Sequence, residues 1–226
     1  MNGKAIVVTG ALGALGKVVA ETALAQGARV AGVDYGHART PPTPGWLELG
    51  GVDLTDAAQA KKAIDAAVSH LGKLDALINI AGGFAFETVA DGDPNTWQRM
   101  HALNVMTALN ASRAAIPHLG ASRAARIVNV GALGALQAST GMGAYAASKA
   151  GVHRLTEALA AELKGRITVN AVLPSIIDTA ANRASMPNAD FAKWVTPQEL
   201  TEVILFLAGD AASAITGALL PVTGRV

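Results

Sequence analysis

Residues 9–16 have the sequence Thr9-Gly10-Ala11-Leu12-Gly13-Ala14-Leu15-Gly16, between an apolar run, Ala5–Thr9, and a helical pattern, Ala14–Gln26. At such a junction a glycine-rich turn lets backbone N–H groups and the helix dipole meet a pyrophosphate. Glycines also serve strand-to-helix turns for packing alone, so the pattern by itself is weak. Its position near the N-terminus favours a dinucleotide site, with candidate contacts at Gly10, Leu12, Gly13, Leu15 and Gly16.

Beyond this turn, short apolar runs rich in β-branched residues alternate with longer helical patterns to the end of the chain. Continuous apolar strands separated by helices are typical of a parallel sheet covered on both faces, with ligands at the carboxyl ends of the strands. The sequence therefore predicts an α/β fold, a doubly wound parallel seven-stranded sheet with helices on both faces, in a single domain of residues 1–226. The expected strands are Ala5–Thr9, Arg29–Asp34, Trp46–Asp53, Leu74–Ala81, Arg126–Val130, Ile167–Leu173 and Ala218–Val222, and the expected helices are Ala14–Gln26, Asp56–Leu71, Pro94 to Leu119, Gly143 to Lys164 and one opened by the capping box Thr196-Pro197-Gln198-Glu199.

Composition excludes several classes of protein. Hydrophobic residues make up 51% of the 226 residues and charged residues 15%, which excludes a disordered chain. A formal charge of +1 is too small to attract nucleic acid or an anionic membrane. The chain has no cysteine, and its five histidines are not spaced as metal ligands, so we expect no disulfide and no metal site. A cytoplasmic protein acting on a small-molecule substrate fits best.

Polar side chains at the ends of the predicted strands indicate how a dinucleotide is held. Asp34, 24 residues after Gly10, is where a carboxylate accepts hydrogen bonds from the adenosine ribose and repels a 2′-phosphate, so NAD(H) is favoured over NADP(H). A solvated aspartate at a strand end is the alternative interpretation. Adenine and ribose contacts are expected from the turns after two further strands, at Asp53, Leu54, Asn79, Ala81 and Gly82.

Tyr145 and Lys149 stand four residues apart in a predicted helix, so both side chains emerge on one face. A nearby ammonium stabilises tyrosinate and lowers the pKa of the phenol, which then exchanges a proton near neutral pH. Lys149 could also bind the nicotinamide ribose. Alone this spacing is structural in most proteins, and only its place after a nucleotide-binding turn makes it a candidate catalytic pair.

Together these motifs resemble the short-chain dehydrogenase/reductase family over essentially the whole chain. Thr9–Gly16, Asp34, Asp53-Leu54, Asn79–Gly82, Asn104, Tyr145 with Lys149, and Pro174 with Thr179 follow in that family's order. The resemblance implies a Rossmann-like sheet, hydride transfer to or from a nicotinamide, and a homodimer or homotetramer. It further implies Tyr145 as acid/base, Lys149 as ribose ligand and pKa modifier, Asn104 as organiser of a water relay, and Pro174 and Thr179 as cofactor contacts.

Two departures from the family pattern bear on chemistry. The second glycine of the usual turn is displaced, so that Ala14 stands in its place and Gly13 precedes it. The catalytic serine normally stands thirteen residues before the tyrosine, where this chain has Ala132, whose methyl cannot donate a hydrogen bond. Ser139 or Thr140 could supply a hydroxyl from the following loop, although turn-forming hydroxyls are common.

The long loop between Leu173 and Thr196 is the candidate lid over the substrate. This segment, with Asp178-Thr179, Ser185-Met186-Pro187 and Ala189-Asp190-Phe191, most resembles dihydropteridine reductase-like members of the family, which likewise lack the serine. A shared lid does not establish a shared substrate.

Three functions remain open at this point. The first is an NAD(P)-dependent oxidoreductase acting on a small carbonyl-like or quinonoid/imine-like substrate, with Tyr145 as acid/base. The second, suggested by Ala132, is a catalytically weak or inactive nucleotide-binding sensor or interaction protein. The third is a 3-oxoacyl thioester reductase.

Overall fold

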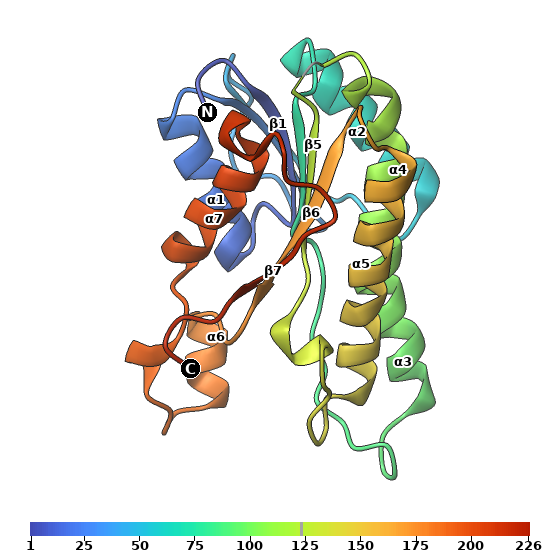
Figure 1. Cartoon of the computed structure of the whole chain (residues 1–226), viewed down its shortest axis with the longest axis vertical. Helices are drawn as coiled ribbons and strands as arrows, with labels where there is room; N and C mark the ends of the chain where they lie inside the picture. The colour runs from blue at the N-terminus through green and yellow to red at the C-terminus, as the bar shows by residue number, and fades with distance from the viewer. Residues whose placement is uncertain (123) are drawn as a thin grey trace.

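The computed structural model describes residues 1–122 and 124–226. Seven parallel strands form one sheet in the order β3-β2-β1-β4-β5-β6-β7, which confirms the predicted architecture (Figure 1). The strands are β1 (Ala5–Thr9), β2 (Arg29–Val33), β3 (Trp46–Leu49), β4 (Ala76–Asn79), β5 (Arg126–Val130), β6 (Thr168–Pro174) and β7 (Leu219–Val222); the α-helices are α1 (Ala14–Ala25), α2 (Ala57–Leu71), α3 (Pro94–His101), α4 (Thr107–Leu119), α5 (Gly143–Glu162), α6 (Ala180–Ser185) and α7 (Pro197–Ala208).

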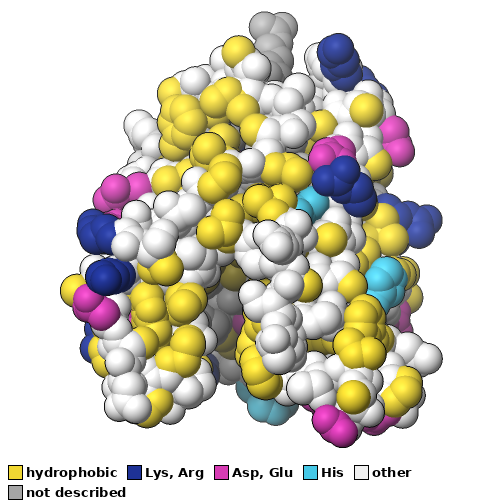
Figure 2. Space-filling view, turned by 60° about the horizontal axis from the view of Figure 1, so that its bottom comes forward, with side chains coloured by type: hydrophobic (Ala, Val, Ile, Leu, Met, Phe, Trp, Pro, Cys, Tyr) yellow, Lys and Arg dark blue, Asp and Glu magenta, His cyan; other side chains and the backbone are white. Residues whose placement is uncertain are grey.

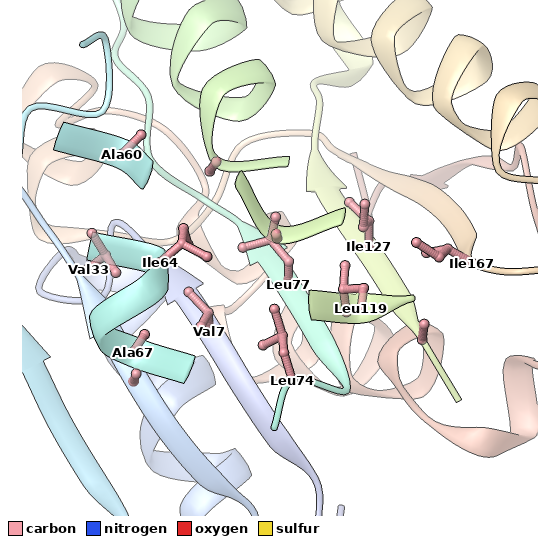
Figure 3. Close-up of a cluster of buried hydrophobic side chains, with 14 of the residues drawn as sticks. Val7, Val33, Ala60, Ile64, Ala67, Leu74, Leu77, Leu119, Ile127 and Ile167 are labelled. Carbon is pink, nitrogen blue, oxygen red and sulfur yellow. The ribbon is translucent and has the colours of Figure 1, made fainter. Parts of the chain in front are cut away.

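Helices cover both faces of the sheet, with α1 and α7 on one side and α2, α4 and α5 on the other (Figure 1). Successive residues of a strand point to opposite faces, so β1 contributes to both layers: Val7 packs under α2 and α4, and Val8 under α1 and α7. Figure 3 shows the first layer, where Val7, Leu77 and Ile127 from neighbouring strands meet Ile64 of α2. Burial on both faces explains why the strands are continuous apolar runs.

The predicted helix starts agree with the observed caps. The Asp56 carboxylate accepts hydrogen bonds from the first turn of α2, and Asp93 does the same for α3, which has proline at its first position. The capping box predicted at Thr196 is present, with the Glu199 carboxylate bonded back to the Thr196 backbone. Local side-chain chemistry thus fixes where the chain turns into each of these helices.

Two segments differ from the sequence prediction in their helical structure. The single helix expected from Pro94 to Leu119 is interrupted by a π-helical turn, Ala102–Met106, because the buried Asn104 bonds outside the helix. The loop expected between Leu173 and Thr196 contains α6 and a short 3₁₀ turn, Phe191–Lys193. No helix in the part of the chain that the structure describes combines the length and apolarity needed to cross a membrane.

Strand β2 ends one residue earlier than the sequence predicts, β3 ends four residues earlier and β4 ends two residues earlier. The chain leaves the sheet at Asp34, after Leu49 and after Asn79, so the residues that follow line the carboxyl edge. The strand order also reverses between β1 and β4, and such a switch point leaves a crevice in an open parallel sheet.

Candidate active site

The glycine turn after β1 is shaped by contacts that admit no side chain. Gly10 has a φ of +67°, and a Cβ at this position would lie 2.8 Å from the Ala81 backbone nitrogen. A Cβ on Gly16 would overlap the Gly10 carbonyl oxygen. The first turn of α1 therefore lies directly against the glycine loop, and its N-terminal N–H groups face the switch-point crevice.

A cleft of about 690 Å³ opens along this edge of the sheet. Gly10, Gly13 and Gly16 form one wall, and the turns after β2, β3 and β4 form the others. The predicted contacts that line it are Gly10, Leu12, Gly13, Leu15, Gly16, Asp34, Asp53, Leu54, Ala81 and Gly82, and the lining residues that the sequence analysis did not single out include Tyr35, Gly36, Arg39, Thr55, Arg99 and Thr107. The size and the donor-rich glycine wall fit a dinucleotide.

Asn79 is one of the predicted cofactor residues that do not line this cleft, and Tyr145 and Lys149 of α5 do not line it either. Its buried amide donates hydrogen bonds to Ser112 Oγ at 3.1 Å and to Asn129 Oδ1 at 2.9 Å. The side chain therefore links β4 to α4 and β5 beneath the site, which is a structural role. Neither Pro174, the last residue of β6, nor Thr179, which follows that strand, occurs among the lining residues of the cleft.

Asp34 connects two of the loops that surround the cleft. One carboxylate oxygen accepts a hydrogen bond from the Leu12 N–H at 2.9 Å, and the other accepts one from the Gly36 N–H at 2.8 Å. Each oxygen keeps a further lone pair for a ligand hydroxyl. Asp34 is thus oriented by the protein at the position predicted for the adenosine ribose.

Asn104 lies in the π-helical turn and is almost fully buried. Its Oδ1 accepts a hydrogen bond from the Gly83 N–H, and its Nδ2 donates to the Gly83 carbonyl and to Ser148 Oγ. Ser148 Oγ in turn donates to the Tyr145 carbonyl at 2.7 Å. Asn104 therefore joins the loop after β4 to the helix that carries Tyr145, and π-helical turns often mark such functional positions. The sequence analysis did not identify Ser148.

Tyr145 and Lys149 lie one turn apart on α5, as predicted, but their pKa values differ from expectation. Burial raises the pKa of the Tyr145 phenol to about 12, and burial lowers the pKa of the Lys149 ammonium to about 8. The Lys149 ammonium donates to the Val130 carbonyl at 2.8 Å. The expected lowering of the phenol pKa is therefore not found for the chain by itself, because burial removes the phenol from water.

Ala132 occupies the serine position and is 5% exposed. Its backbone N–H donates to His153 Nε2 at 3.3 Å. His153 is 1% exposed, and burial, with smaller contributions from Arg154 and Lys149, lowers its pKa to about 4. The sequence analysis treated His153 as a residue on a helix face, yet its neutral imidazole supports the backbone beside the candidate catalytic pair.

Aromatic side chains border the site on its open side. The Phe84 ring packs edge-on against Tyr145, with ring centroids 5.0 Å apart, and is 60% exposed. Phe86 and Leu136 are likewise about 60% exposed, at 63% and 59%. Figure 2 looks onto this end of the molecule, where hydrophobic side chains gather on both sides of a hollow. The exposed Phe84 ring thus gives Tyr145 an apolar neighbour, unlike the hydrogen-bonding walls of the cleft.

The candidate lid, between Leu173 and Thr196, is held by its own polar contacts. The Thr179 hydroxyl caps α6 by accepting a hydrogen bond from the Asn182 N–H at 3.2 Å. Arg183 forms two hydrogen bonds to the Asp178 carboxylate, which lower the pKa of that carboxyl. Phe191 stacks at a tilt on Trp194 with 4.9 Å between ring centroids. Within residues 1–122 and 124–226, no three His, Asp or Glu side chains come together as a metal-binding group.

Comparison with known proteins identifies the family. The family model described as short chain dehydrogenase matches residues 4–190. The chain belongs to the short chain dehydrogenase family. A 2-(S)-hydroxypropyl-CoM dehydrogenase from Xanthobacter autotrophicus is 30% identical over 99% of this chain and 96% of that relative, and a 3-oxoacyl-[acyl-carrier-protein] reductase from Thermotoga maritima is 29% identical over 99% and 98%.

Solved structures of short chain dehydrogenases have the same fold. The Brucella melitensis 3-ketoacyl-(acyl-carrier-protein) reductase in complex with NADH has a TM-score of 0.87, 30% identity, and coverage of 99% of this chain and 98% of that one. The Mycobacterium avium carveol dehydrogenase in complex with NAD has a TM-score of 0.87, 27% identity, and coverage of 99% and 97%. The chain is therefore an oxidoreductase of this family. These relatives do not establish the narrower likeness to dihydropteridine reductase, which stays a prediction.

Proposed function

We propose that this short chain dehydrogenase uses NAD(H) to reduce a small conjugated acceptor of the quinonoid or imine type, with Tyr145 as the proton donor. The observation that carries the proposal is the site at the carboxyl edge, where Asn104 and Ser148 fix the helix that bears Tyr145 and Lys149. A bound nicotinamide would supply or accept the hydride. The glycine wall, which a single Cβ would obstruct, fits the pyrophosphate of such a cofactor.

In this proposal the protein moves one proton and orients the reactants. The Tyr145 phenol, protonated at neutral pH because burial raises its pKa to about 12, donates its proton to the reduced acceptor. Lys149 would hold the nicotinamide ribose and stabilise the tyrosinate that results. Asn104 holds the loop after β4 in place by accepting a hydrogen bond from the Gly83 N–H. Asp34 accepts the adenosine ribose hydroxyls, which favours NAD(H) over NADP(H).

The type of acceptor follows from what surrounds Tyr145. At Ala132 a methyl group replaces the second hydroxyl donor, so a ketone whose oxygen gains localised negative charge receives help from Tyr145 alone. A conjugated acceptor spreads the incoming charge and depends less on a second donor. The exposed Phe84 ring beside Tyr145 offers a surface on which a flat acceptor can stack. This acceptor class is also the one that the predicted resemblance of the 173–196 segment to dihydropteridine reductase-like members would imply.

Steady-state oxidation of NADH tests the proposal with a quinonoid dihydropterin, simple quinones, ketones and a 3-oxoacyl thioester as acceptors. We expect the conjugated acceptors to have the highest kcat/KM. Tyr145→Phe should reduce turnover by about 10²–10⁴-fold while NADH affinity stays nearly constant. Full turnover by this variant on the best acceptor would contradict the assigned proton donor.

A 3-oxoacyl thioester reductase is a second candidate because the Thermotoga maritima relative has that activity in its name. The same acceptor panel separates the two, since a thioester that outperforms every conjugated acceptor would favour the second. Turnover of no acceptor, together with tight binding of NADH, would instead favour a nucleotide-binding sensor. We further propose a homodimer or homotetramer in the cytoplasm, which mass measurement in solution and cell fractionation can test.

A further inference from the structure

Three side chains follow one another along one face of α5. Tyr145, Lys149 and His153 are spaced four residues apart, so they lie on successive turns of the helix. The Lys149 ammonium donates to the Val130 carbonyl at 2.8 Å. The His153 imidazole accepts the Ala132 N–H at 3.3 Å, two residues further along the chain. The proposed proton donor thus shares its helix face with two side chains that hold one short segment of backbone.

These two contacts are complementary in their chemistry. The ammonium only donates, and its partner is a carbonyl oxygen; the imidazole Nε2 accepts, and its partner is an N–H. His153 is 1% exposed and burial lowers its pKa to about 4, so this acceptor is available at neutral pH. A protonated His153 would lose the Ala132 contact and add a second charge near Lys149, which burial opposes.

The backbone between the two contacts allows the imidazole to approach closely. A Cβ on Gly131 would lie 2.5 Å from His153 Nε2, so a side chain at this position would require the ring to move. On its other side Gly131 donates its N–H to the Val172 carbonyl of β6 at 2.9 Å. After Ala132 the chain enters the 3₁₀ turn Leu133–Ala135. The His153 contact therefore links the chain to α5 at the point where the strand pairing of β5 ends.

We propose that His153 is a positioning residue: by holding the Ala132 N–H it keeps the end of β5, and with it the carbonyl that anchors the Lys149 ammonium, in place against α5. This inference rests on the proposed function. Without the imidazole contact the end of β5 shifts, and Lys149 loses its fixed acceptor one helical turn from Tyr145. A displacement of about 1 Å can cost about 10²-fold in rate, so a residue that does not touch the substrate can control turnover.

Two amide variants separate this role from a general loss of packing. Glutamine carries its carbonyl oxygen about as far from the backbone as histidine Nε2, whereas the shorter asparagine reaches only to the position of Nδ1. With NADH and the best acceptor of the panel, His153→Gln should keep kcat within about threefold of the parent, and His153→Asn should lower kcat by about 10–10²-fold. Gly131→Ala should also lower kcat, because its methyl group displaces the imidazole from the other side.

Two further measurements test whether the effect is local. Binding of 5′-ADP reports on the adenosine end of the cleft and should stay within about twofold of the parent in all three variants. The Val130 contact stabilises the charged form of Lys149, whose pKa is about 8, so loss of this contact should move the fall in rate above neutral pH to a lower pH. We expect this displacement in His153→Asn and Gly131→Ala, and not in His153→Gln.

The control is Thr156→Val, one turn further along α5. The Thr156 hydroxyl accepts a hydrogen bond from the buried Asn129 amide at 2.9 Å, so this variant also removes a buried link between α5 and β5, but a link to a side chain instead of to the 130–132 backbone. Urea denaturation should show that Thr156→Val and His153→Asn are both less stable than the parent, while Thr156→Val keeps the kcat and the pH profile of the parent.

The outcomes that contradict the inference are distinct from failure of the proposed function. Equal kcat for the parent and His153→Asn would overturn the inference, and so would equal losses of kcat in His153→Gln, His153→Asn and Thr156→Val. A parent that binds NADH and reduces no acceptor would overturn the proposed function, and the inference with it.

Discussion

Burial of His153 predicts a specific dependence of stability on pH. The imidazole is 1% exposed and accepts the Ala132 N–H, and burial lowers its pKa from 6.5 to about 4. In the unfolded chain the imidazole takes up a proton near pH 6.5, whereas in the folded chain it stays neutral down to about pH 4. Acidification through this window therefore stabilises the unfolded state relative to the folded one.

The size of this loss of stability follows from the lowering of the His153 pKa. A lowering from 6.5 to about 4 corresponds to at most about 3 kcal/mol of unfolding free energy, present above pH 6.5 and lost between pH 6.5 and 4. His153→Gln removes the titration and keeps a side-chain oxygen that can accept the Ala132 N–H. His153→Leu keeps the volume but leaves this buried N–H unpaired, which costs about 1–3 kcal/mol at every pH.

Urea denaturation at constant ionic strength, in steps from pH 7.5 to 4.5, measures these free energies. The parent should lose stability relative to His153→Gln as the pH falls below 6.5, and the difference isolates this histidine from the carboxylates that protonate at lower pH. His101→Gln, on the exposed surface of α3, should follow the parent. Parallel curves for the parent and His153→Gln would refute the reasoning, because they would mean that His153 is protonated equally easily in both states.

Three further outcomes are expected. Ala132→Ser should raise kcat/KM for simple ketones by up to about 10²-fold and should change kcat/KM for conjugated acceptors much less, as measured with NADH in steady state. Equal gains for both would contradict the idea that only the ketone oxygen gains localised charge and needs a second donor. Asp34→Ala should weaken NADH binding in calorimetry and reduce the preference for NADH over NADPH. An unchanged NADH affinity would remove Asp34 from the proposed ribose site. The rate of acceptor reduction should fall as the pH rises through about 8, where Lys149 loses its proton, and Lys149→Arg should move that fall to higher pH or abolish it.

Much of the fold could be predicted because its signals are local. Strand β1 is a short apolar run that ends in glycines, and Asp56, Asp93 and Thr196 each precede a helix with a capping side chain. The π-helical turn at Asn104 could not be predicted in this way, because one extra residue per turn barely changes the apolar period. Its cause is a hydrogen bond to Gly83, 21 residues earlier in the chain.

The residues of the candidate site likewise fall into two groups, those that a local sequence motif indicates and those that only the folded chain brings to the site. Gly10, Asp34 and Tyr145 belong to spaced motifs, so the sequence indicates them directly. Arg39 and His153 belong to no motif, and they lie at the site because β2 pairs with β3 and because α5 packs against the sheet beside β5. Burial is also a property of the folded chain, and it is burial that raises the pKa of Tyr145 instead of lowering it.

The pKa values of Tyr145 and Lys149, the proposed catalytic pair, connect this burial to the proposed proton transfer. At neutral pH the Tyr145 phenol is protonated, and most of the Lys149 ammonium is still charged because its pKa is about 8. Before the reaction the pair therefore carries one uncompensated positive charge in surroundings that disfavour charge. In the proposed reaction, transfer of the phenol proton to an acceptor would leave a tyrosinate one helical turn from the ammonium, and opposite charges attract more strongly away from water than in it. Burial thus opposes ionisation of Tyr145 by itself, so the proposed proton transfer depends on an acceptor that becomes basic as it gains the hydride and on the Lys149 ammonium to stabilise the tyrosinate.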